Sequence, residues 1–99
     1  MNDKLEADNG SPILVSVVVP CFNEEFNIPE LCERVLRVLD HGGLTGELVL
    51  VDDGSADGTR RVIEQRQAQD PDRVHGCFHA RNQGITAAWK TGVAASRGL

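Results

Sequence analysis

The stretch ELVLVDDGSADGTRRVIE, residues 47–64, decides the fold. Its first five residues, ELVLV, form a short apolar run of the kind that is buried in a parallel sheet. The polar loop DDGSADG follows, and a helix is then predicted over residues 59–69, where Val62 and Ile63 would face the core. A strand, a short loop and a helix in this order form the basic unit of an α/β protein.

Similar units precede and follow this stretch. Residues 12–20, PILVSVVVP, predict a strand that is apolar on both faces and therefore buried on both sides. The next segment predicts a helix that Asn27 caps and that Gly42 and Gly43 stop. Residues 73–79, RVHGCFH, predict a weaker third strand, because a glycine interrupts it.

The last predicted helix carries an apolar stripe at helical spacing. Its members are Ile85, Ala88, Trp89, Gly92, Val93 and Ser96. We expect this stripe to pack on the sheet, with Trp89 in the core. The order βαβαβα with short connections predicts a three-layer α/β/α fold, in which helices cover both faces of a parallel, doubly wound, Rossmann-like sheet.

Composition excludes several classes of protein. The net charge of −5 provides no basic surface for nucleic acid. The three cysteines form no CxxC pair, which favours buried thiols in a reducing compartment such as the cytoplasm over disulfides or zinc. The longest apolar run, ILVSVVV, is too short to cross a membrane. Residues 1–11 are polar and acidic, and we expect a disordered tail rather than a signal peptide.

The loop after ELVLV is similar to three kinds of site, two of which the residues exclude. From Asp53 to Glu64 the spacing is close to that of a calcium loop, but a strand precedes it instead of a helix, and Arg60 stands where an apolar residue belongs. A phosphatase loop needs an aspartate two residues before Asp57, and Ser55 is there instead. The third possibility is a nucleotide pocket, without the glycine-rich first loop of a dinucleotide fold.

Polar side chains gather where the predicted strands end. Ligands of an open parallel sheet bind beyond the carboxyl ends of its strands, and the loops PCFNEEF, DDGSADG and ARNQG all lie at that edge. The polar residues that these loops bring together are Asn23, Glu24, Glu25, Asp52, Asp53, Arg81 and Asn82. Carboxylates there can accept hydrogen bonds from a base N–H and from ribose hydroxyls. We assign Ser55 and Asp57 instead to the cap of the helix that begins near Thr59.

Three segments resemble the opening third of family 2 glycosyltransferases, which have the GT-A fold. They are VSVVVPCFNEEFNIPELCERVL, ELVLVDDGSADGTRRVIE and RNQGITAAWKTGVAASRG, and the resemblance covers residues 13–98. The segment FNEEFNIPEL is most similar to the corresponding segment in the branch of the family that makes dolichyl- or polyprenyl-phosphate sugars, such as dolichyl-phosphate mannose synthase. The resemblance implies an enzyme that moves a glycosyl group from a nucleotide-diphosphate sugar to an acceptor such as a polyprenyl phosphate, at the cytoplasmic face of a membrane.

The resemblance also implies a nucleotide-binding role for seven residues. They are Pro20, Phe22, Glu24, Val51, Asp53, Arg81 and Gly84. Phe22 stands where the family usually has tyrosine, so its ring can pack on the base but provides no hydroxyl. Asp53, beside Val51, would accept a hydrogen bond from a ring N–H of the base, and Asp52 would brace the loop. The loop that contains Arg81 would lie near the sugar and the phosphates.

The chain departs from the family in what it lacks. Family members hold Mg²⁺ or Mn²⁺ with a later D-x-D motif and add an acceptor half with a catalytic base. No Asp or Glu follows Asp72 here, so we assign no catalytic and no metal-binding residue. We expect residues 12–99 to be the truncated, nucleotide-binding part of such a domain. The alternative is a shortened, non-catalytic relative that acts as a nucleotide-binding or interaction module.

Overall fold

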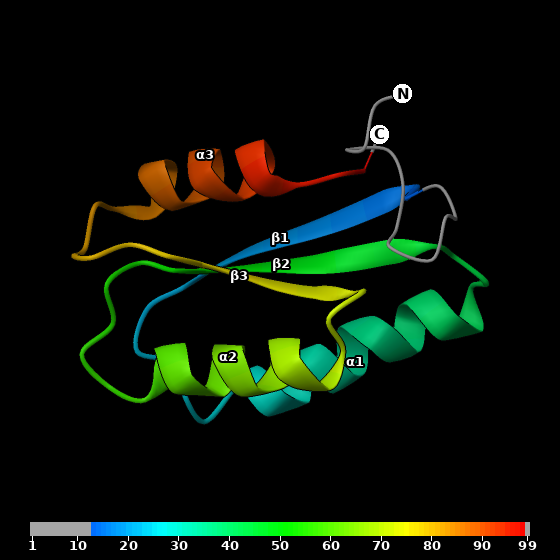
Figure 1. The fold of residues 1–99 in the computed structure, drawn as a ribbon, viewed down its shortest axis with the longest axis horizontal. Helices are drawn as coiled ribbons and strands as arrows, with labels where there is room; N and C mark the ends of the chain where they lie inside the picture. Colours follow the sequence, from blue (N-terminus) through cyan, green and yellow to red (C-terminus); the bar gives the residue numbers. More distant parts are fainter. Residues whose placement is uncertain (1–12, 99) are drawn as a thin grey trace.

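Strands and helices alternate along the chain in the computed structural model, as the sequence predicts (Figure 1). The elements are β1 (Val15–Cys21), α1 (Ile28–His41), β2 (Gly46–Asp52), α2 (Thr59–Gln69), β3 (Val74–Phe78) and α3 (Ile85–Ala95). The structure describes residues 13–98, so the predicted tail, residues 1–11, lies outside the described residues. None of the helices in this part of the chain is long and apolar enough to cross a membrane.

The strands form one parallel sheet, in the order β1-β2-β3 within the described residues. Val18 of β1 pairs with Val49 of β2, and Leu50 of β2 pairs with Gly76 of β3. Figure 1 shows α1 and α2 on one face of this sheet and α3 on the other. The predicted three layers and the parallel, doubly wound sheet are therefore confirmed.

The two apolar strands differ in burial. β2 lies between its neighbours and is buried along its whole length. β1 is only half-buried from Val15 to Pro20, although its composition predicts burial on both sides. The prediction is wrong in this respect because β1 is an edge strand of the described sheet. An apolar groove of about 290 Å³ runs beside it, lined by Val15, Val17, Arg34, Val35, Val38, Leu39 and Leu44.

Apolar side chains fill the space on both faces of the sheet. The buried cluster on the side of α1 and α2 consists of Cys21, Ile28, Cys32, Leu48, Leu50, Ile63 and Val74. On the other face, Val49 and Val51 pack against Ala88 of α3. A Cβ atom on Gly92 of α3 would collide with the side chain of Val18. Glycine and alanine therefore let α3 lie directly on β1 and β2.

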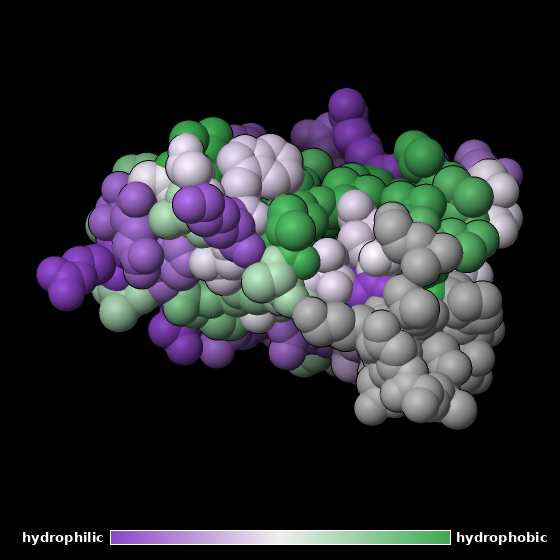
Figure 2. All heavy atoms as spheres, turned by 90° about the horizontal axis from the view of Figure 1, so that it is seen from above, coloured by the Kyte–Doolittle hydropathy of each residue, from purple (hydrophilic) through white to green (hydrophobic). Residues whose placement is uncertain are grey.

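The predicted burial of Trp89 is wrong, since 45% of this residue is exposed. Ile85 and Val93, which stand one turn before and one turn after it, are 65% and 61% exposed. Only the small residues of the predicted stripe, Ala88 and Gly92, are buried on α3, because close contact with the sheet leaves no room there for a larger side chain. Figure 2 views this face, where apolar side chains in green lie among polar ones in purple.

The caps of α1 and α2 only partly follow the prediction. Asn27 precedes α1 but makes no capping bond, because its own φ and ψ of −94° and −21° are already helical. Its side-chain amide donates to Glu24 instead, at 2.6 Å. Asp57 stands one residue before the N-cap, Gly58, and accepts a hydrogen bond from the Thr59 N–H, at 2.9 Å. Ser55 does not cap α2, since its hydroxyl accepts from the Asn23 N–H.

A buried carboxylate stands at the amino-terminal end of β2. Glu47 is 0% exposed, and its carboxylate accepts hydrogen bonds from the Ser16 hydroxyl (2.7 Å) and from both the backbone N–H and the side chain of Arg97. Burial alone would raise the pKa of Glu47, but these hydrogen bonds and the Arg97 charge hold it below its usual range. The Arg97 guanidinium also lies 2.7 Å from the His75 ring. The segment after α3 is thereby tied to the start of the sheet.

Candidate functional site

The three strand-to-helix loops meet at the carboxyl edge of the sheet, as predicted. The loop after β1 is joined to the loop after β2 in both directions: the Asn23 N–H donates to the Ser55 hydroxyl, and the Ala56 N–H donates to the Asn23 side chain, both at 2.9 Å. The Glu24 N–H also donates to the Thr59 hydroxyl, at 2.8 Å. Asn23 has a φ of +54°, which asparagine tolerates better than most residues. These contacts fix the first two loops against each other.

Gly54 brings the second loop against the third. Its φ is +71°, a conformation that residues with side chains rarely adopt. A Cβ atom at this position would overlap with the backbone where Arg81 joins Asn82. The loops after β2 and β3 can therefore touch only because residue 54 has no side chain.

The Asp53 carboxylate organises the third loop. Only 4% of Asp53 is exposed. One oxygen accepts from the His79 ring (2.8 Å) and the Gln83 N–H (2.9 Å), and the other accepts from the Gly84 N–H (3.0 Å) and the Asn82 side chain (3.2 Å). The hydrogen bond from Gln83 and then that from His79 hold the pKa of Asp53 below its usual range. An ionised carboxylate has about four acceptor positions, and these four donors use them.

Two other aspartates, Asp52 and Asp57, stabilise the loop after β2 itself. Asp52 accepts from the Ser55 N–H at 3.0 Å, so it braces the loop as expected. Asp57 accepts from the hydroxyl and the N–H of Thr59 and, at 3.4 Å, from the Glu25 N–H. The Thr59 hydroxyl is the main reason why the pKa of Asp57 is lowered. Neither carboxylate lines the cavity at this edge of the sheet.

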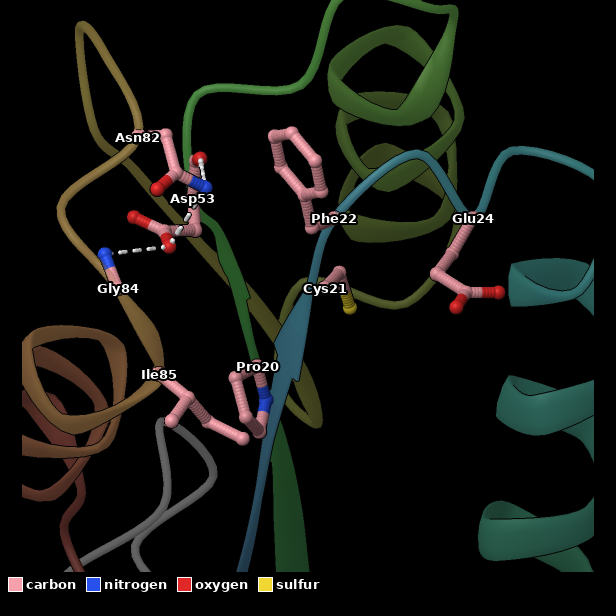
Figure 3. Close-up of a pocket in the computed structure, with 8 residues that line it drawn as sticks. All are labelled: Pro20, Cys21, Phe22, Glu24, Asp53, Asn82, Gly84 and Ile85. Carbon is pink, nitrogen blue, oxygen red and sulfur yellow. Dashed lines mark hydrogen bonds between the residues drawn. The ribbon is translucent and has the colours of Figure 1, made fainter.

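That cavity, of about 280 Å³, opens between the first and third loops (Figure 3). Its lining consists of Pro20, Cys21, Phe22, Glu24, Asp53, Asn82, Gly84 and Ile85. In Figure 3, Asp53, Asn82 and Gly84 lie together on one side, while the Glu24 carboxylate points away from them towards the start of α1. The cavity therefore joins a polar wall to an apolar one.

Comparisons with known proteins agree with this arrangement. Residues 16–99 match the family described as Glycosyl transferase family 2. This chain belongs to glycosyl transferase family 2. The resemblance inferred from the three sequence segments is thereby confirmed.

Proteins that are similar in sequence to this chain are named as transferases. It is 42% identical over 84 residues to the undecaprenyl-phosphate 4-deoxy-4-formamido-L-arabinose transferase of Shewanella sediminis, covering 85% of this chain and 25% of the relative. The proteins of the same name from Aeromonas hydrophila and Pseudomonas aeruginosa are 38% and 40% identical over 85 residues, which cover 86% of this chain and 26% and 25% of the relatives. The chain thus spans about a quarter of the length of these relatives. Undecaprenyl phosphate is a polyprenyl phosphate, whereas the finer similarity to dolichyl-phosphate mannose synthase is not confirmed.

Five of the seven residues predicted to bind nucleotide line the cavity of this family 2 chain. They are Pro20, Phe22, Glu24, Asp53 and Gly84. The other two residues do not line the cavity. Val51 is fully buried in the core next to Ala88, and Arg81 is exposed and lies outside the lining.

The sequence did not single out Cys21 or Ile85 for the site. The helical spacing of Ile85 predicts a place in the core. Its position as the first residue of the helix after the third loop is the one signal that it could line the cavity. Cys21 follows Pro20 directly, but its thiol is not a nucleophile. Burial, and next the charge of Asp52, raise the pKa of Cys21 to about 12, so it stays a neutral thiol.

The described residues do not fit the metal expected for full-length family members. No group of three or more His, Cys, Asp or Glu side chains in residues 13–98 is arranged to hold a metal ion. Both oxygens of Asp53 and one oxygen of Asp52 accept hydrogen bonds from the chain's own donors. This part of the chain therefore offers no set of ligands for Mg²⁺ or Mn²⁺.

Proposed function

We propose that the cavity holds the nucleoside part of a nucleotide-diphosphate sugar, and that this chain is the donor-binding part of a glycosyltransferase. The observation that carries the proposal is the cavity itself, which lies at the carboxyl edge of a parallel sheet in a family 2 chain. Its volume of about 280 Å³ is near the lower end of the range for ligand pockets. It suits a nucleoside better than a complete sugar donor.

The apolar wall can receive the face of the base. Phe22 is 47% exposed, and Pro20 and Ile85 provide further apolar surface in the same lining. A flat ring held against such side chains gains from burial and from aromatic contact, which contributes about 0.5–1.5 kcal/mol beyond the buried area. Phe22 is therefore our proposed main contact for the base.

The polar wall can recognise the edge of the base. We propose that Asp53 accepts a hydrogen bond from a ring N–H, as the family resemblance implies. Because its oxygens already have four donors, the base N–H would share or replace one of them. The exposed Arg81 is separated from this wall by one peptide bond, and we propose that its side chain reaches the sugar or the phosphates.

The reaction that we propose is glycosyl transfer to a lipid phosphate at a membrane surface. A phosphate oxygen of the acceptor would form a bond to the anomeric carbon of the sugar, and the bond from that carbon to the nucleoside diphosphate would break. The acceptor class, a polyprenyl phosphate, is suggested by the names of the relatives. Any Mg²⁺ or Mn²⁺ would have to be held by residues other than those described, so we expect no transfer by these 99 residues alone.

The proposal can be tested with two phenylalanines that stand four residues apart. Phe22 lines the cavity, whereas Phe26 is 89% exposed and does not. We expect the wild-type chain to bind one of UDP, GDP or CDP weakly, with a dissociation constant of about 1 mM or higher. Phe22→Ala should weaken that binding by about 2- to 12-fold, and Phe26→Ala should leave it unchanged. Chemical-shift titration of the ¹⁵N-labelled chain measures both.

Two results would count against the proposal. One is saturable binding whose shifts map away from residues 20–24 and 82–85, because the nucleotide would then occupy another surface. The other is equal weakening by both alanine variants. A radiolabelled transfer assay on the same chain should show no turnover above a control without protein, and metal-dependent turnover would mean that the active site is misplaced.

A further inference from the structure

A line of hydrogen bonds leads from the cavity wall into α3. The His79 ring lies between Asp53 and Thr91, with Nδ1 at 2.8 Å from an Asp53 oxygen and Nε2 at 2.8 Å from the Thr91 hydroxyl. The side chains of His79 and Asp53 are 8% and 6% exposed. Neither His79 nor Thr91 lines the cavity. His79 matches no ligand pattern in the sequence, and the proposed binding of nucleotide does not use it.

The chemistry of the neighbours assigns the ring nitrogens. An ionised carboxylate only accepts hydrogen bonds, so Nδ1 of His79 carries the hydrogen that faces Asp53. In the neutral ring, Nε2 then accepts from the Thr91 hydroxyl. The backbone holds His79 as well, because its N–H donates to the Asp52 carbonyl at 2.8 Å. The ring is thus fixed in position, in orientation and in tautomer.

The same Asp53 carboxylate that receives His79 also receives the cavity wall. Its oxygens accept from the Gln83 and Gly84 N–H groups and from the Asn82 side chain. The orientation of one carboxylate therefore determines where residues 82–84 lie. His79 binds the oxygen that Gln83 also uses, so a rotation of the carboxylate would break both bonds.

We propose that His79 is a positioning residue for this site: its ring holds the Asp53 carboxylate in the orientation that fixes residues 82–84, and Thr91 anchors the ring to α3. Insofar as the positioned wall serves a nucleotide, the inference rests on the function proposed above. The positioning itself does not depend on which ligand binds, and it can be measured without one.

The first test is spectroscopic and uses the free wild-type chain. Long-range ¹H–¹⁵N spectra of the histidine rings should show a hydrogen on Nδ1 of His79, the nitrogen that faces Asp53. The opposite tautomer would overturn the proposal, because Nδ1 could not then donate to Asp53.

The second test follows the wall through hydrogen exchange of the Gln83 and Gly84 amides. Thr91→Val removes the hydroxyl while keeping the shape, and it should speed exchange at both amides; Thr91→Ser, which keeps the hydroxyl, should not. His79→Phe should speed exchange by about tenfold, the effect of one lost hydrogen bond. His79→Asn, whose amide can still donate to Asp53, should restore most of the protection.

His75→Phe is the matched control for His79→Phe. His75 lies in β3 at the opposite end of the sheet, beside Arg97. Its replacement can lower global stability but should not change the exchange of Gln83 and Gly84 relative to other amides of the sheet. If His75→Phe and His79→Phe had the same relative effect on these two amides, or if Thr91→Val had none, the positioning role would be wrong.

Nucleotide titration then separates this inference from the proposed function. Using whichever of UDP, GDP or CDP binds the wild type, affinity should fall about tenfold in His79→Phe and recover in His79→Asn. Absence of binding to the wild type, together with the expected tautomer and exchange results, would contradict the proposed function and support the positioning role. Normal affinity in His79→Phe despite faster exchange would show that the nucleotide does not use this wall, and would overturn the role in the site.

Discussion

The two ends of β2 carry two buried carboxylates, and they are neutralised in different ways. Glu47 at the amino end receives the N–H of Arg97, just after α3, and Asp53 at the carboxyl end receives the N–H groups of Gln83 and Gly84, just before it. The segment after α3 is therefore held by Glu47 of β2, and the segment before α3 is held by Asp53, the residue that follows β2. Each carboxylate also has a histidine nearby, His75 at one end and His79 at the other.

The difference between the two ends lies in the charge that faces the carboxylate. Glu47 contacts the guanidinium of Arg97, so the amino end is an ion pair closed by its own chain. Asp53 is held mainly by backbone and amide N–H groups, and it borders a cavity. A buried, hydrogen-bonded carboxylate is thus a structural anchor at the amino end of β2 and part of the candidate site at its carboxyl end.

The largest expected effect comes from making the same isosteric change at each end. Glu47→Gln removes a fully buried carboxylate that is paired with the Arg97 guanidinium, and it should lower the free energy of unfolding by about 3 kcal/mol. Asp53→Asn breaks hydrogen bonds from backbone and amide N–H groups and no pair with a guanidinium, so it should lower stability less but abolish measurable nucleotide binding. Urea unfolding and nucleotide titration of both variants measure the contrast.

Glu33→Gln, an exposed change on α1, is the control for the loss of a negative charge, and it should leave stability within about 0.5 kcal/mol of the wild type. The comparison of the two ends would fail if Asp53→Asn were the more destabilising change, or if it left nucleotide binding intact.

Both ends of β2, together with Asp57, should contribute to the pH dependence of stability. The pKa values of Glu47 and Asp53 are lowered in the folded chain. A carboxyl group of this kind stabilises the fold above its unfolded pKa, and this stabilisation is lost as the pH falls through the folded pKa. With unfolded values of about 4, the chain should lose stability progressively below about pH 4.

Urea midpoints measured at intervals between pH 7 and pH 3 would show this loss. Glu47→Gln and Asp53→Asn should each have a shallower decline over the same interval, since each removes one of the responsible groups. A decline that neither variant alters would assign the acid sensitivity to other carboxylates.

The smallest expected effect concerns the neutral donors of the two carboxylates. The Ser16 hydroxyl donates to Glu47 and accepts from the Gly98 N–H, and Ser16→Ala should cost about 1 kcal/mol without changing nucleotide affinity. Asn82→Ala at the other end should change stability little, because its side chain is exposed, but should weaken nucleotide binding. Thermal unfolding and titration compare the two, and a reversed pattern would contradict the division into anchor and site.

Local sequence patterns predicted the fold well because they depend on neighbours in the chain. The apolar run of β2 and the glycines after α1 determine where elements begin and end. The same patterns failed to predict which side chains are buried where a helix packs against another element of the fold. Trp89 has helical spacing suited to a core, yet the sheet accepts only Ala88 and Gly92.

The site was predicted at the level of loops and not of contacts. The carboxyl edge of a parallel sheet brings the three loops together in any such fold, which is why most of the candidate residues line the cavity. The bonds from Asp53 to His79 and from Glu47 to Arg97 join residues 26 and 50 positions apart. No spacing rule reaches that far, so neither histidine nor the buried state of Glu47 could be predicted from the sequence.

Gly54 has a consequence for the variation that this protein can tolerate. Every possible replacement adds a Cβ atom, and that atom would meet backbone of Arg81 and Asn82, which cannot move aside as a flexible side chain can. The positive φ of residue 54 adds a second penalty that is independent of the first. Alanine, the mildest replacement elsewhere, is therefore as unsuitable here in kind as a bulky residue. Residue 54 therefore has no conservative alternative, although it contributes no chemical group to the site.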